Sequence, residues 1–305
     1  MGRLIHVESR RETPLPARCL IGRAPVCDLV LSSRDASSQH ASLQWTGSLW
    51  ELHDLGSKNG TFVDEQRLGR GEKVPLRRGL KLRFARQAGT WTLIDEAPPR
   101  PMAISLRSGA LCQMNGGILA LPSDDAPALA IHAQSPERWL VERECEVESI
   151  GDRAIVLVGD EPWRVYLAAR ASGTLDEGPD VLRVADLTLR FAFTRDEEYV
   201  ELVALGRGRG LDLKARAHHY LLLVLARERD AQRAAGVPSP DAGWIHQNRL
   251  LEMLRMDVSH LNITIHRSRV QLGEEGVVDA ARLIERRPGT RQLRIGVSSL
   301  EFVQL

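Results

Sequence analysis

The stretch that decides the fold spans residues 20–63 and reads LIGRAPVCDLVLSSRDASSQHASLQWTGSLWELHDLGSKNGTFV. It contains short segments in which apolar residues alternate with other residues, and polar, glycine-bearing connections separate them. These segments are residues 29–31, 41–43, 50–52 and 61–63. Alternation over a few residues between such turns is typical of β-strands. The sequence therefore predicts a β-scaffold with short loops.

Three of these loops carry polar residues that are too specific for generic turns. Gly22-Arg23 opens one loop, Ser37-x-x-His40 closes a second, and Ser57-Lys58-Asn59-Gly60-Thr61 forms a third. Arginine presents a planar fork of N–H donors, serine a short hydroxyl donor, and an asparagine side chain can bind a peptide backbone. Together these groups are suited to hold a phosphate.

The spacing of these residues is similar to that of a known domain. The matching motifs are Gly22-Arg23-x4-Asp28, Ser37-x-x-His40, Trp50-x-Leu52-x-Asp54-Leu55 and Asn59-Gly60-Thr61. They resemble the forkhead-associated (FHA) domain, a β-sandwich that reads phosphothreonine peptides. The resemblance covers about residues 4–95.

The resemblance implies a ligand-binding role for five residues. Arg23 and Ser37 would bind the phosphate, and Ser38 and Lys58 would flank it. Asn59 would hydrogen-bond the main chain of the ligand. The implied partner is a phosphothreonine-containing protein, either a Ser/Thr kinase or its substrate.

Other matching residues would support the pocket. His40 would be a buried strut of its loop, and Asp28 and Asp54 would tie loops together. The sequence also departs from the family, because Ser38 stands where Arg, Lys or Asn is common and Asp35 adds a negative charge nearby. That charge would weaken phosphate binding or disfavour acidic peptides. An FHA fold that has lost phosphate binding is the alternative, but we favour a working pocket because the three central binding residues are present.

Length and composition limit the number of domains and the class of protein to expect. Its 305 residues suffice for about two or three domains, and 43% hydrophobic with 27% charged residues is ordinary globular composition. The formal net charge is +1, so any nucleic-acid-binding patch must be local. The four scattered cysteines are expected to be free thiols. Because no signal peptide or bilayer-spanning stretch is evident, we expect a soluble, cytoplasmic protein without a membrane partner.

A proline-rich linker ends the first domain. Residues 97–101, Ala-Pro-Pro-Arg-Pro, fit neither a helix nor a central strand. Alternating segments between turn clusters then predict a small β-rich domain over 102–180, with no phosphate loop or catalytic constellation. We expect it to be a spacer or a docking surface for the FHA domain. The predicted domains are thus 1–96, 102–180 and 181–305.

The last domain changes from strand to helix periodicity. Residues 186–193 and 199–205 alternate around a turn and predict a β-hairpin. Three amphipathic helices are then expected, over residues 214–233, 246–256 and about 258–272. Asp257 and Ser259 are candidate caps of the third helix.

A helical projection separates two faces of the third helix. The expected core stripe consists of Val258, Leu261, Ile265, Ser268 and Leu272. The opposite side displays His260, Ile263, Arg267 and Val270, with Thr264 and His266 on its shoulders and Arg269 near the boundary. Long donors and small polar groups on an exposed helix suit insertion into a DNA major groove. A hairpin follows, with five arginines against one glutamate across 282–294, and this local charge suits DNA phosphates.

These elements resemble the winged-helix output domains of two-component response regulators. The match covers about 186–296 and is carried by TIHRSRVQL at 264–272 and IERRPGTRQLRI at 284–295. It implies a C-terminal winged helix-turn-helix that binds double-stranded DNA. The implied DNA contacts are His260, Ile263, Thr264, His266, Arg267, Arg269, Arg286, Arg287 and Arg291. Val270 stands where the family often has arginine, so DNA affinity is expected to be modest or to depend on dimerisation.

We expect neither an enzyme nor a cofactor. The sequence has no GxSxG, HExxH or complete P-loop, and the Gly206–Gly210 tract lacks the P-loop lysine. The histidine pairs 218/219 and 260/266 have no cysteine or carboxylate at metal-ligand spacing, so no metal site is predicted.

Two functions of different class remain. In the first, the chain is a transcription regulator whose FHA pocket captures a phosphorylated partner or a second copy of the chain, and a homodimer would gain avidity for DNA. In the second, it is a signalling adaptor whose winged helix binds proteins. Retention on heparin or random duplex DNA at low salt would favour the regulator.

Overall fold

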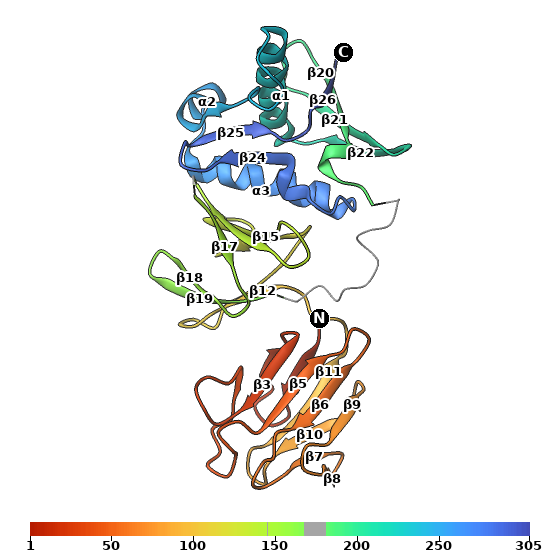
Figure 1. Ribbon diagram of the computed structural model, residues 1–305, viewed down its shortest axis with the longest axis vertical. Helices are drawn as coiled ribbons and strands as arrows, with labels where there is room; N and C mark the ends of the chain where they lie inside the picture. Colours follow the sequence, from red (N-terminus) through yellow and green to blue (C-terminus); the bar gives the residue numbers. More distant parts are fainter. Residues whose placement is uncertain (145, 168–180) are drawn as a thin grey trace. The chain divides into compact units, whose positions relative to one another are not determined.

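The protein is described here from a computed structural model of residues 1–305, with residue 145 and residues 168–180 outside the described part. The chain divides into two compact units (Figure 1). The N-terminal unit comprises Met1–Met102 with Tyr166–Ala171, and the C-terminal unit comprises Ala103–Val165 with Ser172–Leu305. We describe each unit by itself.

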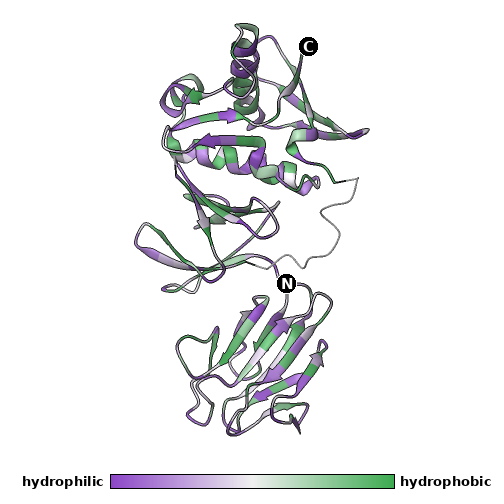
Figure 2. Cartoon of the chain, viewed as in Figure 1, coloured by the Kyte–Doolittle hydropathy of each residue, from purple (hydrophilic) through white to green (hydrophobic). Residues whose placement is uncertain are grey.

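The N-terminal unit is a β-sandwich of two sheets. The six-stranded sheet has the order β2-β1-β11-β10-β7-β8 and the five-stranded sheet the order β4-β3-β5-β6-β9. The strands are β1 (Arg3–His6), β2 (Glu12–Pro14), β3 (Arg18–Gly22), β4 (Leu29–Val30), β5 (Ala41–Trp45), β6 (Trp50–Asp54), β7 (Thr61–Val63), β8 (Gln66–Arg67), β9 (Lys73–Leu76), β10 (Lys81–Phe84) and β11 (Thr90–Asp95). The predicted alternation is visible along them (Figure 2). Their inward side chains, among them Leu43, Trp50 and Phe84, are fully buried in one core.

The middle segment, residues 103–165, opens the C-terminal unit, and strands are the only regular elements among its described residues. Two four-stranded sheets have the orders β13-β12-β19-β18 and β14-β15-β16-β17. The strands are β12 (Met102–Ser105), β13 (Leu111–Gln113), β14 (Ile118–Leu121), β15 (Leu129–Ala133), β16 (Trp139–Arg143), β17 (Glu146–Ile150), β18 (Ile155–Val158) and β19 (Glu161–Tyr166). These strands agree with the β-rich character that alternation predicted for this part of the chain.

The remainder of the C-terminal unit begins with a sheet of order β22-β21-β20-β26. Its strands are β20 (Thr188–Phe193), β21 (Val200–Gly206), β22 (Arg209–Ala215) and β26 (Ser299–Gln304). The predicted hairpin is β20–β21, whereas strand β22 was not predicted. Arg207 and Gly208 between β21 and β22 have φ of 50° and 74°, the positive values that a two-residue hairpin turn needs. The C-terminal β26 pairs in parallel with β20 and was not predicted.

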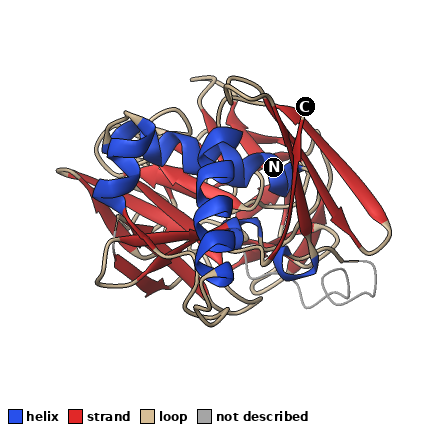
Figure 3. Ribbon diagram, turned by 90° about the horizontal axis from the view of Figure 1, so that it is seen from above, coloured by secondary structure: helices blue, strands red, loops and turns tan. Residues whose placement is uncertain are grey.

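The three α-helices of the described residues all belong to this part of the chain (Figure 3). They are α1 (His219–Ala234), α2 (Gln247–Leu254) and α3 (Val258–Glu274), with 3-10 turns η1 (Val184–Asp186) and η2 (Ala280–Leu283). A small sheet of order β23-β25-β24 joins β23 (Ile245–His246), β24 (Ile284–Arg287) and β25 (Gln292–Ile295). None of the described helices combines the length and apolar character needed to cross a bilayer.

Local chemistry explains where the helices begin and what they bury. The Asp257 side chain accepts the N–H of His260 at 2.8 Å, which confirms it as the N-cap of α3. Helix α1 begins five residues later than predicted, because Lys214 lies in β22 with φ of 60°. The core stripe predicted for α3 is confirmed at Leu261, Ile265 and Leu272, which pack in the core of the C-terminal unit.

Candidate functional site

Three loops of the N-terminal unit adjoin one another: residues 23–28, 31–40 and 55–60. The first two are joined by main-chain hydrogen bonds from Arg23 N to Ser37 O (2.9 Å) and from Ala24 N to Ser38 O (3.0 Å). Gly22 is required at this contact, because a Cβ there would lie 2.4 Å from the carbonyl oxygen of Ser38. The antiparallel pairing of β3 with β5 brings these loop ends together.

His40 connects the second loop to the third from inside the protein. The residue is fully buried, and its Nδ1 accepts the N–H of Ser37 at 3.1 Å. Its Nε2 lies 3.2 Å from Gly60 O, so this nitrogen carries the proton and donates. Burial lowers the pKa of His40 and keeps the ring neutral, as this arrangement requires. The predicted role of His40 as a buried strut is confirmed.

Asp54 shapes the third loop, which carries Lys58 and Asn59. Its Oδ1 accepts the N–H groups of Gly56 (2.9 Å) and Ser57 (3.0 Å), and its Oδ2 accepts the hydroxyls of Ser57 and Thr61, both at 2.6 Å. Burial acts to raise the pKa of this carboxyl, but the hydrogen bonds from Ser57 and Thr61 outweigh it and hold the pKa below its usual value. Asp54 is therefore an ionised tie between loop and scaffold, as predicted. Asp28 plays a similar part, because its Oδ2 accepts the N–H of Leu20 at 2.7 Å.

The Asp35 carboxylate has partners that the sequence did not reveal. It accepts the Ser33 hydroxyl and the N–H groups of Arg86 and Gln87, both at 2.9 Å. These bonds, led by that of Ser33, lower the pKa of Asp35. These donors compensate the negative charge of Asp35. The bonds from Arg86 and Gln87 also anchor the second loop to residues 86–87.

The five predicted ligand-binding residues lie on these loops, and three of them, Arg23, Ser37 and Asn59, each have a donor or acceptor available for a ligand. Arg23 is exposed and its Nε donates to Ala36 O at 3.3 Å, while among the described residues neither Nη group has a partner. Ser37 Oγ accepts the N–H of Lys58 at 3.1 Å, which leaves the hydroxyl proton to donate. Asn59 Nδ2 donates to Asp35 O at 2.7 Å, which leaves its Oδ1 available. Ser38 and Lys58 are exposed at the edge.

This arrangement can bind a dianionic group. A guanidinium with two unpaired Nη groups and a hydroxyl donor come from loops that are hydrogen-bonded to one another, and the exposed Lys58 belongs to the third of these loops. The hydrogen bonds fix the loops before any ligand arrives, so little ordering is needed on binding. Among the described residues, no group of three or more His, Cys, Asp or Glu is placed to hold a metal ion.

The nine predicted DNA-contacting residues fall into two groups in the C-terminal unit. His260, Arg267, Arg287 and Arg291 are exposed and Ile263 is half-buried. Thr264, His266 and Arg269 are buried, and the side chain of Arg286 is only 5% exposed. The structure differs here from the helical projection, which took account of only one packing partner for α3. A second partner, the middle segment, lies along this helix (Figure 1).

Comparison with known proteins addresses the N-terminal unit. Residues 19–85 match the family model of the FHA domain. The N-terminal unit contains an FHA domain. FhaB of Mycobacterium tuberculosis, an FHA domain-containing protein, is 42% identical over 69 residues, which are 23% of this chain and 43% of FhaB. The chain thus spans less than half the length of this relative.

Solved structures also match the FHA domain region. EmbR of Mycobacterium tuberculosis, solved with a low-affinity phosphopeptide, is 32% identical over 32% of this chain and 25% of that chain, with a TM-score of 0.29. The N-terminal FHA domain of Rad53p from S. cerevisiae, solved with a phosphothreonine peptide, is 20% identical over 30% of this chain and 90% of that chain, with a TM-score of 0.28.

Proposed function

We propose that the protein is a phosphothreonine-dependent regulator that binds duplex DNA. Its FHA domain reads a phosphorylated protein, either a Ser/Thr kinase or a kinase substrate, and its C-terminal winged helix contacts DNA. The observation that carries the first half is the set of mutually bonded loops that present Arg23, Ser37 and Asn59.

Each pocket residue has a distinct part in this proposal. The open Nη groups of Arg23 donate to two phosphate oxygens, and the Ser37 hydroxyl donates to a third. Lys58 adds charge at the edge without a fixed geometry, and Asn59 Oδ1 accepts a main-chain N–H of the peptide. A phosphothreonine brings about two negative charges and three strong acceptor oxygens, so these donors distinguish it sharply from threonine.

Peptide libraries with a fixed phosphothreonine, phosphoserine or threonine test this half on the full chain. We expect retention of the phosphothreonine library by the wild type and its loss in Arg23→Ala. Arg77→Ala is the matched control, because Arg77 is an exposed arginine that follows β9 and lies outside the three pocket loops. Equal retention of phosphorylated and unphosphorylated libraries would refute phosphothreonine reading.

The DNA half of the proposal rests on the order of elements and on exposed arginines. A sheet, helix α1, helices α2 and α3, and hairpin β24–β25 follow one another as in a winged helix. Arg287 and Arg294 lie over the ring of Trp244, at 5.5 and 4.4 Å from its centroid, which orients cationic groups near the hairpin. Arg267, Arg287 and Arg291 are exposed, and Arg287 lies 4.0 Å from the carboxylate of Asp241.

Binding to random duplex DNA across a salt series tests this half. Arg267→Ala, Arg287→Ala and Arg291→Ala should each weaken binding and reduce the salt slope by about one. The control is Arg190→Ala, since Arg190 is an arginine of β20 that is ion-paired with Glu301 at 2.6 Å. The alternative is a signalling adaptor whose winged helix binds proteins, and the burial of Thr264, His266 and Arg269 favours it. Failure to bind heparin or DNA at low salt would support the adaptor.

A further inference from the structure

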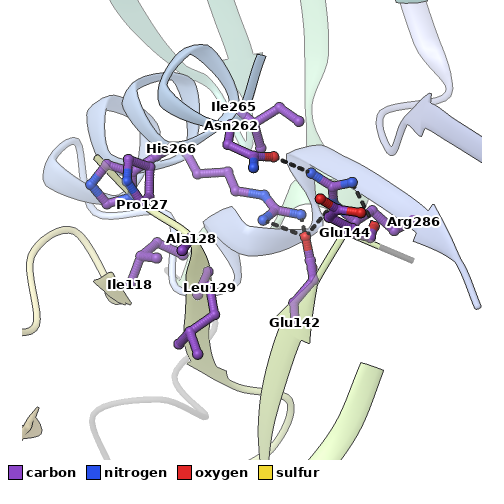
Figure 4. A pocket seen from close by; sticks show the side chains of 12 residues that line it. Ile118, Pro127, Ala128, Leu129, Glu142, Glu144, Asn262, Ile265, His266 and Arg286 are labelled. Atoms are coloured by element: carbon purple, nitrogen blue, oxygen red, sulfur yellow. Dashed lines mark hydrogen bonds and ion pairs between the residues drawn. The ribbon is translucent and has the colours of Figure 1, made fainter. Parts of the chain in front are cut away.

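The middle segment covers the part of α3 and β24 that was predicted to meet DNA. Glu142 of β16 accepts a two-pronged pair from Arg269, with Nη1–Oε1 at 3.0 Å and Nη2–Oε2 at 3.1 Å. The same carboxylate accepts Arg286 Nε at 2.8 Å, and Arg286 also donates to Glu144 O at 2.6 Å. Figure 4 shows the side chains of Glu142 and Arg286 that meet at this contact. The side chains of Glu142, Arg269 and Arg286 are 9%, 3% and 5% exposed.

Two further contacts hold the middle segment against α3. Asp124 Oδ1 lies 2.9 Å from His266 Nε2, so a second carboxylate meets a third predicted DNA contact. At the end of α3 the two backbones touch, because a Cβ on Gly273 would lie 1.9 Å from Gly116 O. A Cβ on Gly116 would likewise lie 2.5 Å from Val270 O, and Gly116 has φ of +51°. Glycine at both positions is what allows this close approach.

Arg269 binds the Glu142 carboxylate in the geometry by which an arginine binds a phosphate. A guanidinium fork binds a carboxylate and a phosphate in the same two-pronged geometry, so one partner excludes the other. Burial alone would raise the pKa of Glu142, but the charges of Arg269 and Arg286 hold it far below its usual range, and the carboxylate is ionised. The N–H groups of Arg269 and Arg286 that face Glu142 are therefore occupied while the middle segment stays in place.

We propose that the middle segment is an intramolecular inhibitor of DNA binding, in which Glu142 occupies the place of a DNA phosphate at Arg269 and Arg286. This inference rests on the proposed DNA-binding function and adds its regulation. DNA binds fully only when β16 leaves α3. The measured affinity is then the intrinsic affinity multiplied by the fraction of molecules in which the segment has moved away.

A charge reversal tests the proposal without altering any predicted DNA contact. Glu142→Arg places a third guanidinium beside two buried ones and forces the segment off α3. Glu148→Arg is the matched control, because it makes the same charge change at an exposed residue of the neighbouring strand β17. We expect Glu142→Arg to bind duplex DNA at least about tenfold more tightly than Glu148→Arg, since even a small closed-state bias of 1.4 kcal/mol corresponds to a factor of ten.

A second pair of variants covers the case in which the charge reversal prevents folding. Gly273→Ala replaces glycine by a better helix former but collides with Gly116 O, whereas Gly151→Ala adds a Cβ that meets nothing within 4 Å. Hydrogen exchange of β16 reports opening, and anisotropy of a labelled duplex reports DNA binding. Faster exchange together with tighter DNA binding in Gly273→Ala alone supports the proposal.

Two contrary results have different meanings. If β16 exchanges faster but DNA affinity stays at that of the control, the middle segment is not an inhibitor, and the DNA-binding function stands. If neither the wild type nor the opened variants bind DNA at low salt, the proposed DNA-binding function fails, and the inference with it.

Discussion

Replacing Asp54 tests how the loop that carries Lys58 and Asn59 is held in place. The residue is 3% exposed, and its two oxygens accept four hydrogen bonds from Gly56, Ser57 and Thr61. Asp54→Ala removes every acceptor. The Thr61 hydroxyl is then left fully buried without one, whereas solvent reaches the exposed Gly56. Because a buried donor without an acceptor costs about 1–3 kcal/mol, we expect a total loss of about 3–4 kcal/mol.

Asp54→Asn should be much milder, for a reason that the geometry supplies. The amide oxygen can keep the two backbone N–H groups, and its NH₂ can donate to the hydroxyls of Ser57 and Thr61, which rotate to accept. Only the charge assistance is lost, so the expected cost is about 1–2 kcal/mol.

Native-state hydrogen exchange of the full chain is the suitable assay, because a protein of two units does not give a single unfolding free energy. The opening free energy of the β7 amides should fall in the order wild type, Asp54→Asn, Asp54→Ala. Phosphothreonine-peptide affinity should fall in the same order. Unchanged protection in Asp54→Ala, or equal losses in both variants, would contradict this reading of the loop.

Further predictions concern ionisation and the rim of the pocket. Burial lowers the pKa of His219 to about 4, so its neutral form is favoured in the folded state. The associated stability, up to about 3 kcal/mol, is complete above the unfolded pKa of about 6.5 and is lost as pH falls towards about 4. His219→Gln should remove this pH dependence from the native-state hydrogen exchange of the α1 amides. Burial, aided by Asp124, raises the pKa of Cys112 to about 11. Its alkylation near pH 8, followed by mass spectrometry, should be about 100-fold slower than that of an unperturbed cysteine, and a rate equal to it would refute the assignment. Lys58→Ala should weaken phosphothreonine-peptide binding by only about two- to fivefold, and the difference should shrink at high salt, whereas a salt-independent loss would place Lys58 deeper in the pocket.

Much of the FHA pocket could be predicted because its signals are local and chemical. The resemblance to the FHA domain implied the roles of His40 and Asp54, and the structure shows the bonds expected of them. The Asp257 cap and the core stripe of α3 are equally local, since they depend on residues within one helix. Asp35 is the exception within the pocket, because two of its three donors, Arg86 and Gln87, lie 51 and 52 residues away.

The C-terminal unit was harder to predict because its decisive contacts join distant segments. The projection of α3 identified one buried face, but the second arises from Glu142, which is 127 residues before Arg269. Nothing in the segment around β16 marks a charged residue as buried rather than solvated. Strand β26 was missed for a related reason, because its partner β20 lies 111 residues earlier and their pairing is parallel.

The most direct test of the central claim is a thermodynamic cycle between Arg23 and the ligand phosphate. Peptides with threonine or phosphothreonine at one position would be titrated calorimetrically into the wild-type chain and into Arg23→Ala. If the guanidinium binds the phosphate, phosphorylation should strengthen binding to the wild type by at least about 2 kcal/mol more than to Arg23→Ala. A coupling energy near zero would mean that Arg23 does not contact the phosphate and that the pocket does not read phosphothreonine in the way described.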